Sequence, residues 1–410
     1  MAILKGDTMA FEDYTGVMES GFLRGEVTLS IGKTELTAVS AFDTAVVSYA
    51  DITAIEYRDW AAHLQTDRGP VKLSRMGRNG ERFYDDLCAA YNKKVLAALF
   101  VAGGPLIETI GEYRAEEGGR AFAGRGVLQV YGNCVCVLPP NEDARRIPLC
   151  FLADMRQEGF VLALTLDTGE RYSVIRLGRD TDPFEAGITE QLRKMRDKAL
   201  AVVRQMDPAL PAMQAAAIAK CLPEGVAAPL GQLAAIAPSF VKAVERKIGE
   251  SSATASYAAF RELCDPAQIC VGLKKQFARG GGGEATADAP EGTQEEDLEE
   301  ELMLWMIAPG KNGRTAAVEF GEADAATFLY RYDCGWDSFR QSLNLALEAI
   351  AFRREGIRLR DAELLLPQYD TYKMAARRNA ALQFVRGCYA GRVIHASPEK
   401  WKRNVAKHLE

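Results

Sequence analysis

The sequence predicts an α+β protein. Two tandem antiparallel β sandwich or barrel domains, each closed by a C-terminal helix, are followed by a helical connector and a C-terminal α+β domain. Turn signals in the first half recur after about one hundred residues. Each series of strand-like segments ends in one amphipathic helix. The second half changes from alanine-rich sequence to a new series of strand-like segments, and 410 residues suffice for several domains.

The first half of the chain contains the repeat. The aligned segments are Ile31-Gly32-Lys33-Thr34 with Tyr131-Gly132-Asn133-Cys134, Asp67-Arg68-Gly69 with Asp167-Thr168-Gly169, and Gly77-Arg78 with Gly178-Arg179. The shift is 100 residues at the first two landmarks and 101 at the third, so one inserted residue reconciles them. A repeat of this length is a domain and not a solenoid unit. We place the two copies at residues 20–105 and 120–206.

Each copy is expected to be a series of short antiparallel strands followed by one helix. In the second copy, residues 127–131 and 134–138 predict strands joined by the tight turn Gly132-Asn133, because glycine adopts positive φ freely. Gly32-Lys33 is expected to hold the same place in the first copy. The closing helices carry apolar stripes, formed by Phe83, Leu87, Tyr91, Val95 and Leu99 and by Phe184, Ile188, Leu192, Met195 and Ala199. We expect both stripes to be core.

A strand meander closed by one C-terminal helix, in about one hundred residues, resembles the pleckstrin-homology-like fold. Two in tandem resemble the bacterial-type tandem modules of scaffold and chaperone-type proteins. The resemblance covers residues 20–205 and rests on element order. It implies a binding module for peptides, proteins or lipid headgroups. Phosphoinositide binding by the family's usual route is not expected, because the first hairpin loop is too short to form a phosphate-binding basin.

The second half begins with the connector, residues 207–264, where prolines punctuate alanine-rich sequence and predict short helices. Residues 265–410 predict an α+β domain. Its expected strands are 269–277, 302–308, 315–320 and 327–332, of which the first also suits a helix. Between the first two strands, a glycine run and many carboxylates predict a flexible acidic loop at residues 279–301. That glycine run lacks the Lys-Ser/Thr end of a phosphate-binding P-loop.

The C-terminal end is expected to be helical and basic. Residues 336–410 contain fourteen Lys or Arg against eight Asp or Glu. Helices are predicted over 337–353 and 369–389, and a last helix begins at Pro398 with Ser397 as its N-cap. The candidate anion-binding or partner-binding residues are Arg353, Arg354, Arg358, Arg360, Arg377, Arg378 and Arg386. These arginines suit solvated helix faces, a surface that binds nucleic acid or another anionic partner, or a docking site for the acidic loop.

Composition narrows the function classes. The nine cysteines include no Cys-x-x-Cys pair, and there are three histidines, so we expect no metal site, no catalytic triad and no cofactor. A net charge of -6 argues against a nucleic-acid coat protein. The sequence contains neither a signal peptide nor an apolar run of membrane-spanning length, so a cytoplasmic protein is expected.

These observations favour a non-enzymatic interaction or scaffold protein whose sheet edges and loops bind protein partners. Nucleic-acid or anionic-polymer binding through the C-terminal arginines is the alternative, and an enzyme of unknown type is the second alternative. Trp60 is expected in the core. If it were exposed, it would mark a partner-binding patch. The oligomeric state is not predicted.

Overall fold

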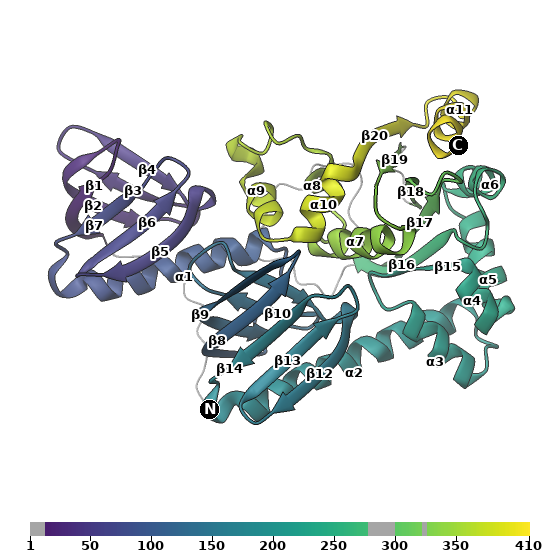
Figure 1. Cartoon of the computed structure of the whole chain (residues 1–410), viewed down its shortest axis with the longest axis horizontal. Coiled ribbons are helices and arrows are strands. Elements are labelled where there is room, and N and C mark those ends of the chain that lie inside the picture. The colour runs from purple at the N-terminus through teal and green to yellow at the C-terminus, as the bar shows by residue number, and fades with distance from the viewer. Residues whose placement is uncertain (1–12, 278–299, 322–325) are drawn as a thin grey trace.

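The computed structural model describes residues 13–277, 300–321 and 326–410, and it contains three antiparallel sheets with helices between and around them (Figure 1). The acidic stretch expected at residues 279–301 lies outside the described residues, except for its last two positions. Those two belong to a strand of the third sheet. The architecture is α+β, as predicted.

The first sheet is a curled half-barrel with the strand order β4-β3-β2-β1-β7-β6-β5. Its strands are β1 (Tyr14–Glu19), β2 (Arg24–Ile31), β3 (Glu35–Val39), β4 (Thr44–Ser48), β5 (Ile52–Arg58), β6 (Ala61–Thr66) and β7 (Val71–Ser74). The helix α1 (Gly80–Ala98) closes this unit. It buries the predicted stripe Phe83, Leu87, Tyr91 and Val95, and Leu99 is buried at its C-cap.

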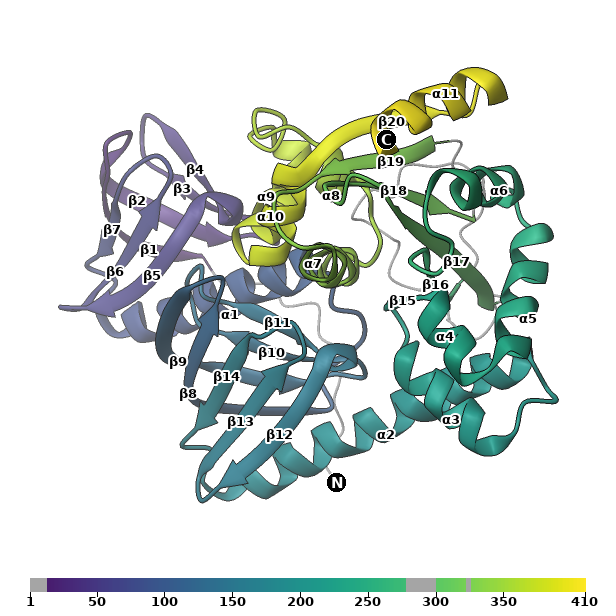
Figure 2. The same ribbon diagram turned by 45° about the vertical axis from the view of Figure 1, so that its right-hand side comes forward.

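The second sheet has the corresponding order β11-β10-β9-β8-β14-β13-β12. Its strands are β8 (Ile107–Glu117), β9 (Arg120–Val130), β10 (Cys134–Leu138), β11 (Arg145–Pro148), β12 (Leu152–Glu158), β13 (Val161–Leu166) and β14 (Arg171–Ile175). The long helix α2 (Thr181–Met206) follows and leads towards the connector (Figure 2). Phe184, Ile188 and Ala199 are buried on α2, while Leu192 and Met195 are half-buried. The predicted repeat is therefore present in the strand order and in the closing helices.

One landmark of the sequence alignment is wrong by one residue. The N–H of Gly32 donates to the carbonyl of Glu35 at 2.9 Å, and the N–H of Tyr131 donates to the carbonyl of Cys134 at 2.8 Å. These hydrogen bonds close equivalent turns, so Gly32 corresponds to Tyr131 and the shift there is 131 − 32 = 99 residues. The shared glycine at positions 32 and 132 had favoured the other alignment. The turn of the first copy is thus 33–34 and remains short.

Four helices connect the second sheet to the third. They are α3 (Ala212–Cys221), α4 (Leu230–Ile236), α5 (Pro238–Gly249) and α6 (Thr254–Leu263). Pro211 and Pro229 are the N-cap residues of α3 and α4, and Pro238 is the first residue of α5. Proline fits these positions because the first turn of a helix leaves its N–H groups unpaired in any case.

The third sheet is a six-stranded antiparallel meander whose order differs from that of the first two. Its strands are β15 (Ala227–Pro229), β16 (Cys270–Phe277), β17 (Glu300–Pro309), β18 (Thr315–Phe320), β19 (Ala326–Arg331) and β20 (Tyr389–Ile394). The remaining helices are α7 (Trp336–Ala349), α8 (Glu355–Arg358), α9 (Asp370–Arg377), α10 (Ala380–Cys388) and α11 (Pro398–Leu409). The segment 269–277 is therefore a strand, and Ser397 and Pro398 begin the last helix as expected.

Both faces of the third sheet are buried. Trp305 and Ile307 of β17 pack in the same core as α7, which lies between the second and third sheets (Figure 2). Leu304 and Met306 pack on the opposite face with the connector helices and α11. A strand buried on both faces reads as a continuous apolar run, as β17 does.

The helix predicted over 369–389 is wrong in its extent. Helix α9 ends at Arg377, α10 begins at Ala380, and Tyr389 is the first residue of strand β20. Asn379 is extended between the two helices (φ −141°, ψ 108°), and its side-chain oxygen accepts a hydrogen bond from the N–H of Leu382 at 2.6 Å. This N-cap starts a second helix in a new direction, because an asparagine side chain satisfies a backbone N–H that the helix leaves unpaired.

Candidate functional site

The seven candidate arginines all contact other residues of the chain, and Arg378 is buried. Arg360 pairs with Glu363 and Arg358 with Glu355, while Arg386 binds Asp361 and the carbonyl of Gly356. Arg353 stacks over the ring of Phe100, and Arg354 stacks over that of Phe320. Arg377 and Arg378 reach into the first two repeats. Each of the seven thus has a partner within the chain, a contact pattern that favours structural roles over one shared binding surface.

Helix α9 docks on the first repeat through ion pairs. The Nζ of Lys373 lies 2.6 Å from Asp51 and 2.9 Å from Asp67. Arg377 lies 2.7 Å from Asp67 and 3.4 Å from Glu142 of the second repeat. One helix from the C-terminal domain therefore contacts both repeats, and its partners in the first repeat lie more than 300 residues away in sequence.

The equivalent aspartates of the two repeats, Asp67 and Asp167, have opposite pKa shifts. Burial alone would raise the pKa of Asp67, but the hydrogen bonds from Arg377 and Lys373 outweigh it and lower that pKa. Burial raises the pKa of Asp167 to about 6, and the neighbouring charge of Glu170 adds to this effect. The aspartate at this turn is thus surrounded by cations in the first repeat, whereas in the second repeat it lies beside another carboxylate.

The outer edge of the first sheet is occupied. The N–H of Ile55 on β5 donates to the carbonyl of Pro140 at 2.8 Å, and the N–H of Glu142 donates to the carbonyl of Thr53 at 3.0 Å. Residues Ala54 and Asn141 form an isolated antiparallel bridge between these two hydrogen bonds. A segment of the second repeat therefore extends the first sheet at β5.

The outer edge of the second sheet, β12, has the same geometry without such a partner. Both edge strands carry a bulge at the same place, between Ile52 and Ala54 in β5 and between Leu152 and Asp154 in β12. By this equivalence, the carbonyl of Ala153 and the N–H of Met155 point outward. Among the residues that the structure describes, no backbone group pairs with this edge of β12.

Both repeats carry an exposed aromatic side chain at the hairpin tip that follows this edge strand. Trp60 is 78% exposed and Phe160 is 72% exposed. The expectation that Trp60 belongs to the core is wrong, because it occupies the turn between β5 and β6 with φ 60°, beside Asp59 with φ 52°. Positive φ is strained for a bulky side chain and is found in tight hairpin turns.

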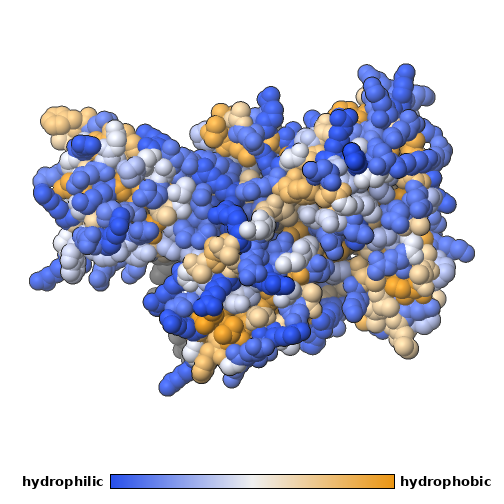
Figure 3. All heavy atoms as spheres, in the orientation of Figure 1, coloured by the Kyte–Doolittle hydropathy of each residue, from blue (hydrophilic) through white to orange (hydrophobic). Residues whose placement is uncertain are grey.

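Figure 3 shows that hydrophobic residues on one face form several separate patches among hydrophilic ones.

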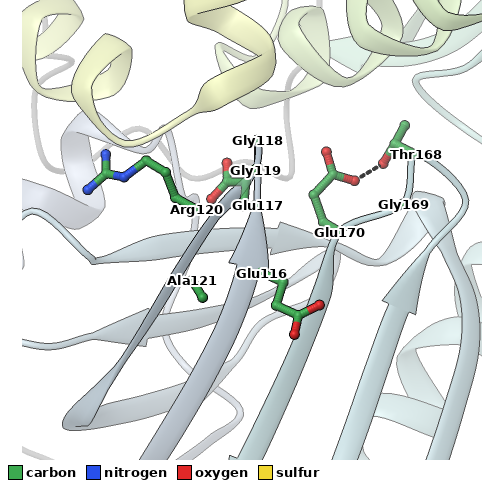
Figure 4. A pocket seen from close by; sticks show the side chains of 9 residues that line it. All are labelled: Glu116, Glu117, Gly118, Gly119, Arg120, Ala121, Thr168, Gly169 and Glu170. Carbon is green, nitrogen blue, oxygen red and sulfur yellow. Dashed lines mark hydrogen bonds between the residues drawn. The ribbon is translucent and has the colours of Figure 1, made fainter.

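A hollow of about 510 Å³ lies between the β8–β9 hairpin and the β13–β14 turn. It is lined by glycine backbone and by charged side chains, among them Glu116, Glu117, Arg120 and Glu170 (Figure 4). All three of these carboxylates have partners, and Glu116 lies 3.6 Å from Arg171. Glu170 accepts a hydrogen bond from Thr168, and Glu117 binds Arg145 and the N–H of Ala380. Small-molecule sites are mostly apolar with a few convergent polar groups, which this lining does not provide.

The third sheet contains a buried polar network that the sequence did not indicate. Thr327 donates to Glu319 at 2.5 Å, lies 3.0 Å from the Nε2 of His395, and accepts from the indole of Trp401 at 2.7 Å. A hydroxyl beside a histidine and a carboxylate suggests a nucleophile, but Thr327 is fully buried, with no exposed surface for a substrate. The network ties α11 to the sheet.

In the described part of the chain, no group of three or more His, Cys, Asp or Glu side chains could hold a metal ion. None of the helices in residues 13–277, 300–321 and 326–410 has both the length and the apolar character needed to cross a membrane. No protein-family model matches the sequence, and no curated protein matches it either.

Proposed function

We propose that this chain is a non-enzymatic interaction protein with two pleckstrin-homology-like repeats, the second of which binds an extended segment of a protein partner. The partner segment adds as a strand to the outer edge of β12. One observation carries the proposal: the equivalent edge in the first repeat, β5, already holds an extended segment through two main-chain hydrogen bonds. The duplication thus provides an internal example of the binding mode.

The chemistry of the edge supports this reading. An exposed sheet edge offers unpaired N–H and C=O groups, which native proteins cover or use for strand addition. Strand β12 alternates half-buried and exposed side chains, and the exposed Phe160 follows it at the hairpin tip. Main-chain hydrogen bonds would supply the affinity of an added strand, and an aromatic anchor beside it would supply selectivity.

The competing reading, binding of nucleic acid through the C-terminal arginines, has less support. Phosphate contacts need cationic groups that are free to exchange water for phosphate. Arg377 and Arg386 are held by carboxylates, and Arg378 is 2% exposed. The exposed Arg360 also has a carboxylate partner, Glu363, at 3.1 Å.

The substitution Met155→Pro tests the proposal. Proline removes the outward N–H of β12 and is tolerated on an edge strand, where that N–H has no ladder partner. The matched control is the double substitution Asp154→Ala and Arg156→Ala, which removes an exposed ion pair of 2.6 Å from the same strand and leaves the main chain intact. Proteins captured from the native host should be lost with Met155→Pro and retained with the control.

A captured set that is unchanged by Met155→Pro would contradict the proposal, because strand addition at this edge requires the N–H. Loss of the same proteins with the control alone would assign binding to side chains and would contradict it as well. Circular dichroism and the unfolding midpoint of each variant establish that the fold is intact before capture.

A further inference from the structure

A small enclosed cavity lies where the C-terminal domain meets both repeats. Its walls come from the end of α1 (Leu99), from β11 (Arg146), from α7 (Ala349), and from α9 and α10 (Ala375, Leu382). Arg378 and Asn379, between α9 and α10, complete it. The centre of a water-sized sphere can occupy about 10 Å³ within it, which is room for one water-sized particle.

Two buried arginines are among the residues that line this cavity. The side chain of Arg146 is 4% exposed, and Arg378 is 2% exposed. The Nε of each has no hydrogen-bond partner among the residues that the structure describes, although the other nitrogens are engaged. An unpaired donor on a buried cation is costly, so such a group ordinarily has a partner.

The carboxylates around these arginines are engaged with other cations. Glu348 accepts from Arg146 at 2.9 Å with one oxygen and from Lys274 at 2.7 Å with the other. Glu142, whose charge acts on Arg378, lies 3.4 Å from Arg377. The cations Arg146 and Lys274 therefore share the one buried carboxylate of Glu348, and this carboxylate is not a hydrogen-bond partner of Arg378.

Among the described residues, the hydrogen-bond partners of Arg378 are both neutral. Its Nη2 donates to the hydroxyl of Tyr91 at 2.6 Å, and its Nη1 donates to the carbonyl of Met374 at 3.2 Å. Burial lowers the pKa of this arginine, the direction expected of a cation taken out of water. The cavity also lies at the N-terminus of the nine-residue helix α10, where the helix dipole favours negative charge.

We propose that this cavity binds a small monovalent inorganic anion of the chloride class between Arg146 and Arg378. An anion accepts from both unpaired Nε donors and supplies the missing counter-charge, whereas a water molecule satisfies the donors alone. The volume suits a monatomic ion and excludes phosphate or sulfate. The bound ion joins α1, β11 and the α9–α10 segment, so that anion binding stabilises the packing of the C-terminal domain on both repeats.

Bromide replaces chloride as the first probe. Crystals of the full chain grown in sodium bromide, with diffraction measured at the bromine absorption edge, should show an anomalous peak in the cavity in contact with both guanidinium groups. A cavity without such a peak in saturating bromide overturns the proposal and assigns the site to water.

Thermal unfolding supplies the second test in solution. In sodium chloride, the unfolding temperature of the full chain should exceed that in sodium gluconate of equal ionic strength by about 2–4 °C, as expected for a ligand that binds the folded state alone. The difference should vanish in Arg378→Met and in Ala349→Val, which fills the cavity and keeps both arginines. It should persist in the matched control Arg360→Met, because Arg360 is exposed and lies outside the cavity.

An equal unfolding temperature in the two salts, or an undiminished chloride effect in Arg378→Met, overturns the proposal. If Arg378→Met does not fold, Ala349→Val decides the question by the same comparison. If that variant does not fold either, the bromide peak in the unmodified chain decides it.

Discussion

The two repeats share a strand order but not their surroundings. In the first, β3 and β4 alternate buried and exposed residues, so one face of the sheet meets solvent. In the second, every residue of β10 and β11 is buried. Val135 and Val137 pack inside the second sheet, while Cys134, Cys136 and Leu138 pack with the core of the first repeat. One copy is peripheral and the other is the centre of the molecule.

The two copies of the duplicated domain have diverged in their surroundings while keeping the same strand order. The position of Val46, which is 38% exposed in the first repeat, holds the buried Arg146 in the second. The edge strand β5 of the first repeat is covered by the second repeat, whereas the outer edge of β12 has no backbone partner in the part of the chain that the structure describes. Each difference reflects the parts of the molecule against which that copy packs.

The largest expected effect comes from the buried charges that distinguish the second repeat. Glu348→Gln leaves Arg146 and Lys274 without a carboxylate and should lower the free energy of unfolding by about 3–5 kcal/mol. In the first repeat, Val46 takes the place of Arg146, and Val46→Ala should change the free energy of unfolding by about 0.5 kcal/mol or less. Chemical denaturation of both variants measures the contrast. Equal effects would mean that the buried cluster does not hold the domains together.

The paired aspartates should respond with opposite signs at pH 7. Asp67→Asn removes a carboxylate that Lys373 and Arg377 stabilise, and should destabilise the fold by about 1 kcal/mol. Asp167→Asn removes a carboxylate that burial disfavours, and should stabilise it by a similar amount, about 1 kcal/mol. Matched unfolding curves test this. The same sign for both substitutions would contradict the electrostatic difference between the repeats.

The contributions of Asp67 and Asp167 to stability should also depend on pH in different ways. Because the folded-state pKa of Asp67 is lowered, its contribution is complete above its unfolded value and is lost as the pH falls through the folded value. Because the folded-state pKa of Asp167 is raised to about 6, its penalty develops as the pH rises from the unfolded value through 6. Unfolding midpoints measured between about pH 3 and about pH 8 should shift in opposite directions in the two Asn variants.

Hydrogen exchange compares the two sheet edges directly. The amide of Ile55 is bonded to Pro140, whereas the equivalent amide of Met155 has no partner among the described residues. We expect Ile55 to exchange at least about 100-fold more slowly than Met155, because its exchange requires the repeats to separate locally. Equal rates measured by NMR would contradict the difference between the covered and the open edge.

The smallest expected effect concerns the hairpin tips. Trp60→Gly creates an Asp-Gly turn, the sequence preferred where both turn residues have positive φ, and should stabilise the fold by about 0.5–1 kcal/mol. Phe160→Gly should not stabilise it, because the positive φ at that tip belongs to Gly159. Thermal unfolding of the two variants tests the contrast. Destabilisation by Trp60→Gly would show that the indole makes a stabilising contact.

The sequence predicted the repeat because turn residues and helix stripes are local signals. The continuous apolar run Cys134–Leu138, set against the alternating Glu35–Val39, also reflects the burial that separates the copies. The one-residue alignment error arose from a glycine that occurs in both turns but not at equivalent positions. These features depend on a few neighbouring residues, which a single sequence displays.

The partners of the arginines could not be predicted in the same way. Arg377 meets Asp67 across 310 residues, and Arg378 meets Tyr91 across 287. The sequence around a charged residue on a helix is the same whether that residue contacts water or a carboxylate that is distant in the chain. Trp60 was misplaced for a related reason, since apolar character favours burial but the hairpin turn decides exposure.

The contact between α9 and Asp67 has a consequence for the order in which the molecule is completed. A chain is synthesised from its N-terminus, and domains generally fold as they emerge. The first repeat therefore waits for about 300 further residues before Lys373 and Arg377 reach its carboxylates, on the order of 15–60 seconds of translation. Until then Asp51 and Asp67 lack these two cations, and the edge strand β5 is covered by the second repeat. Nascent chains stopped before α9 should present the first repeat in this unfinished state.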